Sequence, residues 1–433
     1  MTLGADALSL LILVGATGLA GVVILRQCPK VAICLWLTAL VLLPSWLAIP
    51  FLASLQPASL VGALVCVAML PVTPGRLILG DFVVPAVFVT CLAAFLMAPE
   101  NVDAPVRVLT LWVVGYVLGR SAAERLSYEW IAKALAVAFT AVAVGALLEF
   151  ATQTNPFHKL TAGNNAYETW GQEAFRGGLP RVEGAFGHPL ALGACIALVL
   201  PLVAACGYRF RVRLAMILVM LASVVLTFSR AALFCSVVGL LLTMLTRRSG
   251  LSAAQLKASL LSLAAAAAVT GPWLLGVFRA AGQEATESGE YRTQLLQIAP
   301  SINILGLADS YDKAPNGDVR FGAFKSIDNA ALLIGLTYGL LPLLLAAALY
   351  VYAGLEVARL RATPTVTALV AHIPALLTVA FITQYTVFFW FVVGMAVAQQ
   401  AQLSEKIPST SPSCRTRRDS RTRRGANRQH LAR

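Results

Sequence analysis

The stretch RVEGAFGHPLALGACIALVLPLVAAC, residues 181–206, places Arg181, Glu183 and His188 directly before an apolar run long enough to cross a bilayer. A charged side chain near lipid is costly, so each of these groups is either solvated or functional. Similar apolar runs recur along the 433-residue chain, which is 58% hydrophobic and only 12% charged, with a mean hydropathy of +0.78. Because a segment within lipid satisfies its backbone hydrogen bonds only as a helix, the sequence predicts an all-α polytopic membrane protein.

The hydropathy pattern predicts about twelve or thirteen spans. Their expected ranges are 6–25, 31–53, 57–75, 82–98, 106–120, 130–150, 188–206, 213–229, 231–246, 257–278, 328–353 and 366–400. The last range is too long for one helix, and the polar run Thr383, Gln384 and Tyr385 near its middle predicts a hairpin of two spans. The first ten residues, MTLGADALSL, contain no basic residue, so we expect a first span there rather than a cleaved signal peptide.

The basic residues divide the chain into a membrane domain, 1–400, and a tail, 401–433. The tail is rich in Ser, Thr and Arg and lacks an apolar pattern, which predicts a disordered cytoplasmic segment. It carries much of the net charge of +13. Attraction to anionic lipid explains such a tail better than nucleic-acid binding, so no nucleic-acid partner is expected.

Short basic connections assign the two sides of the membrane. The connections 26–30, 208–213, 247–250 and 356–361 are basic and are expected to face the cytoplasm. Two long polar loops, 151–187 and 279–327, then lie on the opposite face. Neither loop contains cysteine, and no Walker loop, HExxH or CxxC motif occurs, so we expect no disulfide, no nucleotide hydrolysis and no thiolate metal site.

Arginines are concentrated in the two outer loops, where the positive-inside rule makes them least expected. Arg176 and Arg181 lie in the first loop, Arg292 and Arg320 lie in the second, and Arg230 follows Ser229 in a very short outer turn. Any one of them could extend to the phosphate layer of the membrane without further function. Together they favour an anion site, because guanidinium binds phosphate oxygens in a bidentate manner.

The segment SIDNAALLIGLTYGLL, residues 326–341, begins a span with Asp328 and Asn329. Either side chain at a helix start can serve only as an N-cap. A carboxylate beside the arginines can also act as a general base. Both roles remain open at this point.

Four short motifs in order resemble those of the O-antigen ligase and O-antigen polymerase family of bacterial envelope glycosyltransferases. They are Arg181 followed by Gly-x-Phe-x-His-Pro, the TFSR turn ending at Arg230, Tyr291–Arg292, and Asp328–Asn329 with Gly339 after nine further residues. The resemblance covers roughly residues 130–355. It implies a GT-C-like fold whose large outer loop caps a cavity, and transfer of a glycan from undecaprenyl diphosphate to an acceptor glycan or lipid without a metal or other cofactor.

The resemblance also implies roles for particular residues. Arg181, Arg230 and Arg292 match arginines that hold the diphosphate, while Ser229, Asn329 and Gly339 support the site. Asp328 stands where the ligases have histidine. Because a carboxylate is a weaker base than imidazole at neutral pH, this difference favours a polymerase or another envelope glycan transferase over a strict ligase.

The remaining histidines are interpreted individually. His188 precedes Pro189 at a helix start, where it is either a packing residue or an alternative base. His372 is interpreted as structural, and His158 as an outer-loop residue without an identifiable partner.

The resemblance, together with the expected topology, therefore implies an inverting, metal-independent glycosyltransferase of the bacterial plasma (inner) membrane, with its active site on the extracytoplasmic face. A transporter or flippase of a lipid-linked or anionic solute is the alternative. Transporters usually carry ionisable residues near the bilayer midplane. Here Asp81, Lys133, Glu149 and Arg230 all lie near the ends of spans, which favours the enzyme.

Overall fold

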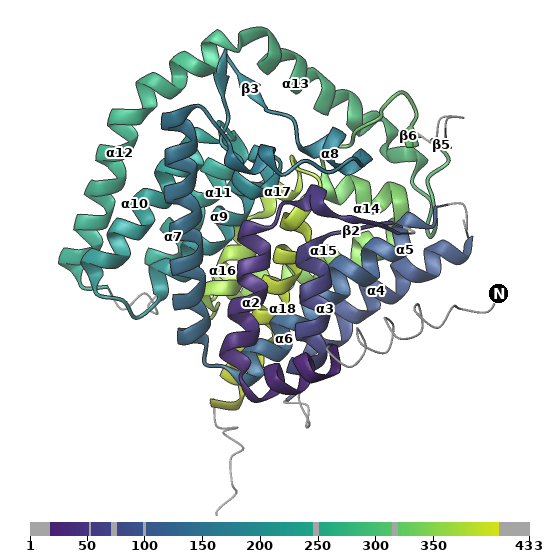
Figure 1. Cartoon of the computed structure of the whole chain (residues 1–433), viewed down its shortest axis with the longest axis horizontal. Helices are drawn as coiled ribbons and strands as arrows, with labels where there is room; N and C mark the ends of the chain where they lie inside the picture. Colours follow the sequence, from purple (N-terminus) through teal and green to yellow (C-terminus); the bar gives the residue numbers. More distant parts are fainter. Residues whose placement is uncertain are drawn as a thin grey trace, which may run out of the picture.

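The computed structural model describes residues 18–51, 53–70, 76–97, 101–245, 251–313 and 319–406. The first part of the expected 6–25 span, the 247–250 connection and nearly all of the expected tail lie outside these residues. Helices dominate the described chain (Figure 1). This confirms the all-α, polytopic class in its general form.

Among the described residues, six helices are long and apolar enough to cross a membrane. They are α4 (Leu79–Met97), the continuous helix Asp103–Arg125 (α5 Asp103–Arg107, the π-helical η2 Val108–Val113 and α6 Val114–Arg125), α7 (Tyr128–Thr152), α12 (Ala253–Ala280), α15 (Leu340–Ala358) and most of α18 (Thr383–Lys406). Shorter apolar helices are Gly18–Gln27, α2 (Pro29–Leu42), α3 (Pro57–Met69), α9 (Pro189–Ala205) and α11 (Arg230–Leu245).

The other elements complete the bundle and its loops. The helices are η1 (Ser45–Leu47), η3 (Pro156–Lys159), α8 (Asn165–Trp170), η4 (Gly184–Phe186), α10 (Phe210–Leu226), α13 (Gly282–Leu295), η6 (Leu296–Ser301), α14 (Ala330–Tyr338), α16 (Pro364–Ala371) and α17 (Ile373–Leu376). Three antiparallel hairpins, which the sequence did not predict, pair β1 (Ile49–Phe51) with β2 (Ala53–Leu55), β3 (Phe175–Arg176) with β4 (Leu179–Pro180), and β5 (Tyr311–Lys313) with β6 (Val319–Phe321).

Several predicted spans differ from the structure. The expected span 31–53 ends as a helix at Leu42, just before Pro44, and continues as η1 and the β1–β2 hairpin. Proline cannot donate a helical hydrogen bond, which explains the early end. The expected span 328–353 is interrupted at Gly339, between α14 and α15. The range 366–400 is interrupted, but the interruption lies between Leu376 and Thr383, and the polar run Thr383–Tyr385 begins α18. Among the described residues of this range only α18 is long enough to cross a membrane, so the predicted hairpin of two spans is not observed.

Helix α9, which forms the apolar part of the opening stretch, lies at the centre of the bundle. All of its residues except Leu190 and Ala205 are buried. It packs against α7, α10, α11, α16 and α18. A helix that is apolar on every side can be accommodated only in such a core or in lipid. By contrast, most residues of α12 and α15 are not covered by other parts of the protein, so these two helices lie at the periphery of the bundle.

Helices α6 and α18 make the closest helix contact through glycines. A Cβ added at Gly119 would lie 2.0 Å from Phe391 O, and one added at Gly394 would lie 2.1 Å from Tyr116 O. Small residues allow membrane helices to approach this closely, so that van der Waals packing stabilises the pair. Trp36, Trp112 and Trp390 pack in the surrounding aromatic cluster.

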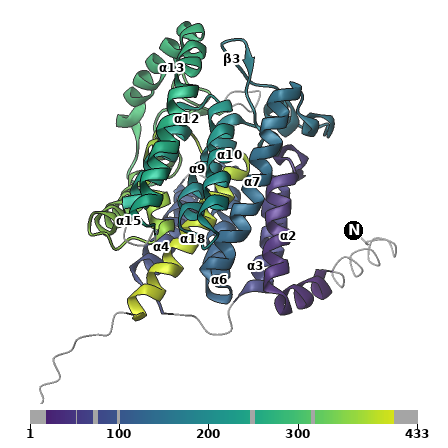
Figure 2. The same ribbon diagram turned by 90° about the vertical axis from the view of Figure 1, so that its left-hand side faces the viewer.

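The two ends of the bundle differ in character. Residues 153–188, 281–313 and 319–329 lie together at one end, which we call the loop end, and the C-terminal end of α18 lies at the other (Figures 1 and 2). At that other end Arg125 donates to Ala68 O and Arg26 O, and Arg120 donates to Arg76 O. The basic connection beginning at Arg26 therefore lies opposite the loop end.

Candidate functional site

Two arginines of the first loop bind the turn between α10 and α11, residues 226–230. Arg181 Nε donates to Thr227 O at 2.9 Å, and Arg176 Nη1 donates to Phe228 O at 2.9 Å. The backbone continues this contact, because Val182 N donates to Leu226 O. The segment 176–182 is thus fixed against the turn that begins α11.

Ser229 and Arg230 occupy the start of α11. Ser229 is buried, and its Oγ accepts a hydrogen bond from Ala232 N at 3.2 Å, which is the geometry of a helix cap. Arg230 is exposed, and its guanidinium lies 5.5 Å from the ring centroid of Phe278 at the end of α12. Arg181 and Arg230 therefore lie at the same turn, and Ser229 caps the helix that follows it.

Helix N-termini gather around this turn. The first turns of α9 and α11 are in contact, because a Cβ at Gly193 would lie 2.7 Å from Ala232 Cβ. Helix N-termini carry partial positive charge and bind anions. Their position adds to the positive potential of the arginines.

The second group of predicted residues lies where α13 leads to α14. Tyr291 donates to Ser326 O, and Ser326 Oγ donates to Asp328 Oδ1 at 3.1 Å. Asn329 caps α14, because its Oδ1 accepts from Leu332 N at 2.9 Å. The capping role therefore belongs to Asn329, and Asp328 makes no cap contact.

Arg292 is half-buried near the end of α13. Within the described ranges, neither Arg292 nor Asp328 forms a hydrogen bond or an ion pair with Arg181 or Arg230. The predicted site residues thus form two groups at the loop end, one around residues 226–230 and one around residues 291–329.

Gly339 is explained by the backbone that packs on it. Its φ is +104°, and an added Cβ would lie 2.7 Å from Leu305 Cα. Gly306 N and Ala308 N donate to the last carbonyls of α14, and Leu340 N and Leu341 N donate to Asn303 O and Ile304 O. Glycine is required because a side chain would displace the segment 303–308, which satisfies the helix ends on both sides of the break.

His188 caps α9 through its ring. Nδ1 accepts a hydrogen bond from Leu190 N at 3.2 Å, and Trp170 packs edge-on against the imidazole. Burial, with the nearby Arg181 charge, lowers the pKa of His188 to about 4. In the neutral ring the Nδ1 lone pair is occupied, so the proton is on Nε2. This geometry makes His188 a hydrogen-bond donor and argues against its use as the alternative base.

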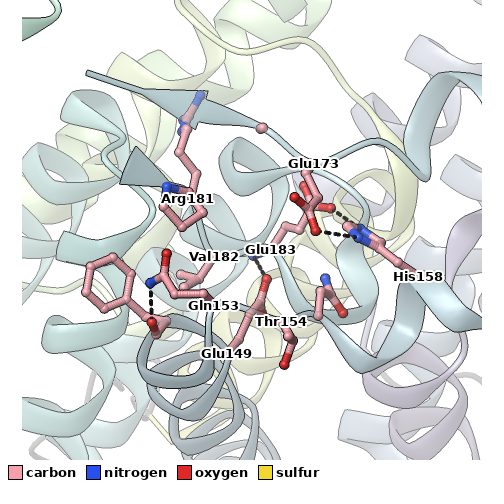
Figure 3. Close-up of a pocket in the computed structure, with 12 residues that line it drawn as sticks. Glu149, Gln153, Thr154, His158, Glu173, Arg181, Val182 and Glu183 are labelled. Atoms are coloured by element: carbon pink, nitrogen blue, oxygen red, sulfur yellow. Dashed lines mark hydrogen bonds and ion pairs between the residues drawn. The ribbon is translucent and has the colours of Figure 1, made fainter. Parts of the chain in front are cut away.

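A polar pocket beside Arg181 contains three residues that the sequence did not connect (Figure 3). His158 Nε2 lies 2.7 Å from Glu183 Oε1, so the expectation that His158 has no partner is wrong. Glu149, at the end of α7, accepts from Glu183 N and Gly184 N at 3.1 and 2.9 Å. From sequence alone, Glu149 is only a charged residue near the end of a span. An acidic residue at the C-terminal end of a helix is unfavourable without such partners, and this was the available signal.

The charges in this pocket influence one another. The hydrogen bond to Glu183 raises the pKa of His158, although burial opposes the shift. Burial raises the pKa of Glu183, and the bond to His158 opposes it. Both directions favour a proton held between the two side chains.

His372 is buried and its Nε2 lies 2.9 Å from Tyr385 Oη within an aromatic cluster. This environment is that of a packing residue. In the part of the chain that the structure describes, no group of three or more His, Cys, Asp or Glu side chains is arranged to hold a metal ion.

Together the fold and this site define a polytopic helical membrane protein with a basic site at one end of its bundle. No protein-family model matches the chain, and no curated protein matches it with significant similarity. The resemblance to envelope glycan ligases and polymerases therefore depends on the four motifs and on the positions of their residues.

Proposed function

We propose that this protein is a membrane glycosyltransferase that moves a glycan from undecaprenyl diphosphate to an acceptor glycan or lipid. The proposal places the loop end on the extracytoplasmic face of the bacterial plasma membrane, as the basic connections predict. One observation carries it most strongly. Arg181 and Arg230, which are 49 positions apart in the sequence, lie at one turn, beside the N-termini of α9 and α11.

The chemistry follows from these groups. Guanidinium groups and helix N-termini stabilise negative charge on a departing diphosphate, and they do so most effectively when they are already fixed in place. The hydrogen bond to Thr227 O fixes Arg181 in this way. Arg292 contributes a further guanidinium from the second loop.

Asp328 is the preferred base of the proposed reaction. Its carboxylate oxygen Oδ1 accepts from Ser326 Oγ, and Asn329 performs the capping. In an inverting displacement the acceptor hydroxyl attacks the anomeric carbon, the bond to the diphosphate oxygen breaks, and the hydroxyl proton moves to Asp328. His188, as a neutral donor, would hold an oxygen of donor or acceptor in position.

Glycan transfer in membranes that carry Arg230→Ala or Asp328→Asn tests this function. We expect a loss of roughly 10²–10³-fold in rate for each variant, as for removal of one preorganised charge-stabilising group. Arg211→Ala, an exposed arginine on α10, and Asp312→Asn, an exposed aspartate on β5, are matched controls and should retain activity. Full transfer by both test variants would refute the proposed chemistry.

A transporter or flippase is the second candidate, and the interrupted helices favour it. The breaks at Gly339 and between α17 and α18 resemble the discontinuous helices of secondary transporters. Proteoliposomes separate the two functions, because a transporter moves the lipid-linked glycan between leaflets without changing its covalent structure. Membranes without the protein also distinguish a polymerase, whose loss leaves single repeat units, from a ligase, whose loss leaves long chains.

A further inference from the structure

The pocket beside Arg181 has a buried acceptor that nothing in the protein satisfies. Glu183 is 1% exposed and lines the pocket, and its Oε2 has no hydrogen-bond partner among the described residues. Its other oxygen, Oε1, is bound to His158. A buried carboxylate oxygen without a donor is costly, so this atom is expected to receive a hydrogen bond from a molecule in the pocket.

Further acceptor capacity surrounds Glu183. Each carboxylate oxygen of Glu149 accepts one backbone N–H and retains a second lone pair. Gln153 and Thr154 lie at the exposed side of the pocket, and Phe150 adds an apolar surface. Carboxylate, amide and hydroxyl groups beside an aromatic ring are the side chains that bind a molecule with several hydroxyls.

The charges around the pocket exclude a strongly charged occupant. Glu173 and Glu183 repel an anion, while Arg181 and the Glu183-bound His158 repel a cation. A neutral molecule that donates hydrogen bonds fits both sets. The pocket opens to solvent, and its enclosed part is about 20 Å³, which is room for one hydroxyl group or one water molecule. One hydroxyl of a sugar can enter this space while the ring lies at the exposed side of the pocket, beside Gln153 and Thr154.

We propose that this pocket, which we call the Glu183 pocket, is a subsite for one neutral sugar ring whose hydroxyl donates to Glu183 Oε2. The assignment rests on the proposed function for the origin of that sugar, because Arg181 borders both this pocket and the turn assigned to the diphosphate. The sugar belongs either to the acceptor or to the lipid-linked donor.

Saturation-transfer NMR on the full-length protein in lipid nanodiscs tests the subsite without requiring activity. The probes are free glucose, galactose and N-acetylglucosamine. We expect at least one to bind, with a dissociation constant in the range of about 1 mM that a single small ligand commonly shows. Glu183→Gln should weaken that binding about tenfold or more, since it removes a charge-assisted hydrogen bond.

Two further variants keep the test decisive. Glu168→Gln changes an exposed carboxylate on α8 that does not line the pocket, and binding should be unchanged. Thr154→Val removes a hydroxyl from the exposed side of the pocket, where folding is least at risk, and should weaken binding severalfold. Absence of binding for every probe, or equal binding by wild type, Glu183→Gln and Thr154→Val, would overturn the subsite and leave the pocket as a hydration site.

Transfer kinetics then identify the source of the sugar. If Glu183→Gln raises the concentration of acceptor needed for half-maximal transfer, the acceptor sugar occupies the pocket; if it raises that of the lipid-linked donor, the donor sugar does. If sugar binding depends on Glu183 but the Arg230→Ala variant keeps full transfer, the subsite is supported and the proposed chemistry is refuted. If Arg230→Ala loses transfer but sugar binding does not depend on Glu183, the proposed function is supported and the subsite is refuted.

Discussion

Arg181 Nε donates to the carbonyl oxygen of Thr227 at 2.9 Å, across 46 positions of the chain. This bond fixes the planar guanidinium before any ligand binds. Lysine at this position keeps the charge but loses the fork of parallel donors. We expect Arg181→Lys to lower the rate of glycan transfer by about 10²-fold.

The same substitution should change the free energy of unfolding by only about 1 kcal/mol, the usual net contribution of one hydrogen bond. Arg211→Lys, on exposed α10, controls for the chemistry of the substitution and should leave transfer intact. Transfer that survives Arg181→Lys unchanged would mean that the charge alone, and not the fork, is used at this turn.

The histidines report the two polar environments directly. The chain has only four, so ¹³C-labelled histidine gives a simple NMR spectrum in which His→Gln variants assign each signal. The pKa of His158 is raised by its bond to Glu183, and the pKa of His188 is lowered to about 4 by burial. We expect the His158 signal to titrate above pH 6.5 and the His188 signal to remain that of a neutral ring from pH 5 to 8.

The signs of these shifts predict how the first loop responds to pH. The stabilisation from His158 is complete below its unfolded-state pKa and is lost as pH rises through the higher folded-state value. The raised pKa of Glu183 acts in the same direction, because deprotonation of a buried carboxyl becomes costly as pH rises. Hydrogen exchange of residues 153–184 should therefore become faster from neutral to alkaline pH, beyond the intrinsic increase. Protection that increases instead would contradict the pairing.

Gly339→Ala tests the interrupted helix. The φ of +104° and the contact with Leu305 Cα should cost about 1–3 kcal/mol of stability and increase hydrogen exchange in the segment 303–308. Gly354→Ala in α15 is the matched control, because no atom lies within 4 Å of its added Cβ. There alanine should be neutral or stabilising by up to about 1 kcal/mol. Similar melting temperatures for the two variants would be evidence against the docked segment.

Gly119→Ala tests the contact between α6 and α18. The added methyl would overlap Phe391 O, a backbone atom, so the two helices must separate. We expect a loss of about 3 kcal/mol or more, at the upper end of overpacking effects, measured as thermal unfolding in detergent. Gly145→Ala on α7, which meets no atom within 4 Å, should melt like wild type. An unaffected Gly119→Ala would show that this helix pair tolerates separation.

Local features of the fold were largely predictable from sequence. The apolar stretch that became α9 predicts a helix by composition alone, and Asn329 before an apolar run predicts a cap. The early end of α2 and the break at Gly339 were not predicted, because hydropathy averages over a window and does not register a single Pro44 or a glycine with positive φ.

The candidate site could be predicted only in part. The sequence predicts that Arg181 and Arg230 lie on the same face of the membrane. The structure adds that Arg181 contacts the turn 226–230, to which Arg230 belongs. The contact between His158 and Glu183 joins positions 25 apart within one irregular loop, where no periodicity relates residues in space. Arg181 donates to the backbone carbonyl of Thr227. Because every residue has such a carbonyl, the sequence of side chains does not predict which one accepts this hydrogen bond.

Helix α12 has 28 residues, which corresponds to a length of about 42 Å, whereas the hydrocarbon core of a bilayer is about 30 Å thick. Protein covers little of it, so its tilt is set largely by lipid. Its upper end contacts Arg230 through Phe278 and continues into α13 (Figure 2). A change in membrane thickness therefore changes the tilt of α12 and, with it, the position of Phe278 beside residues 226–230. The length of the lipid acyl chains thus affects the geometry of the site.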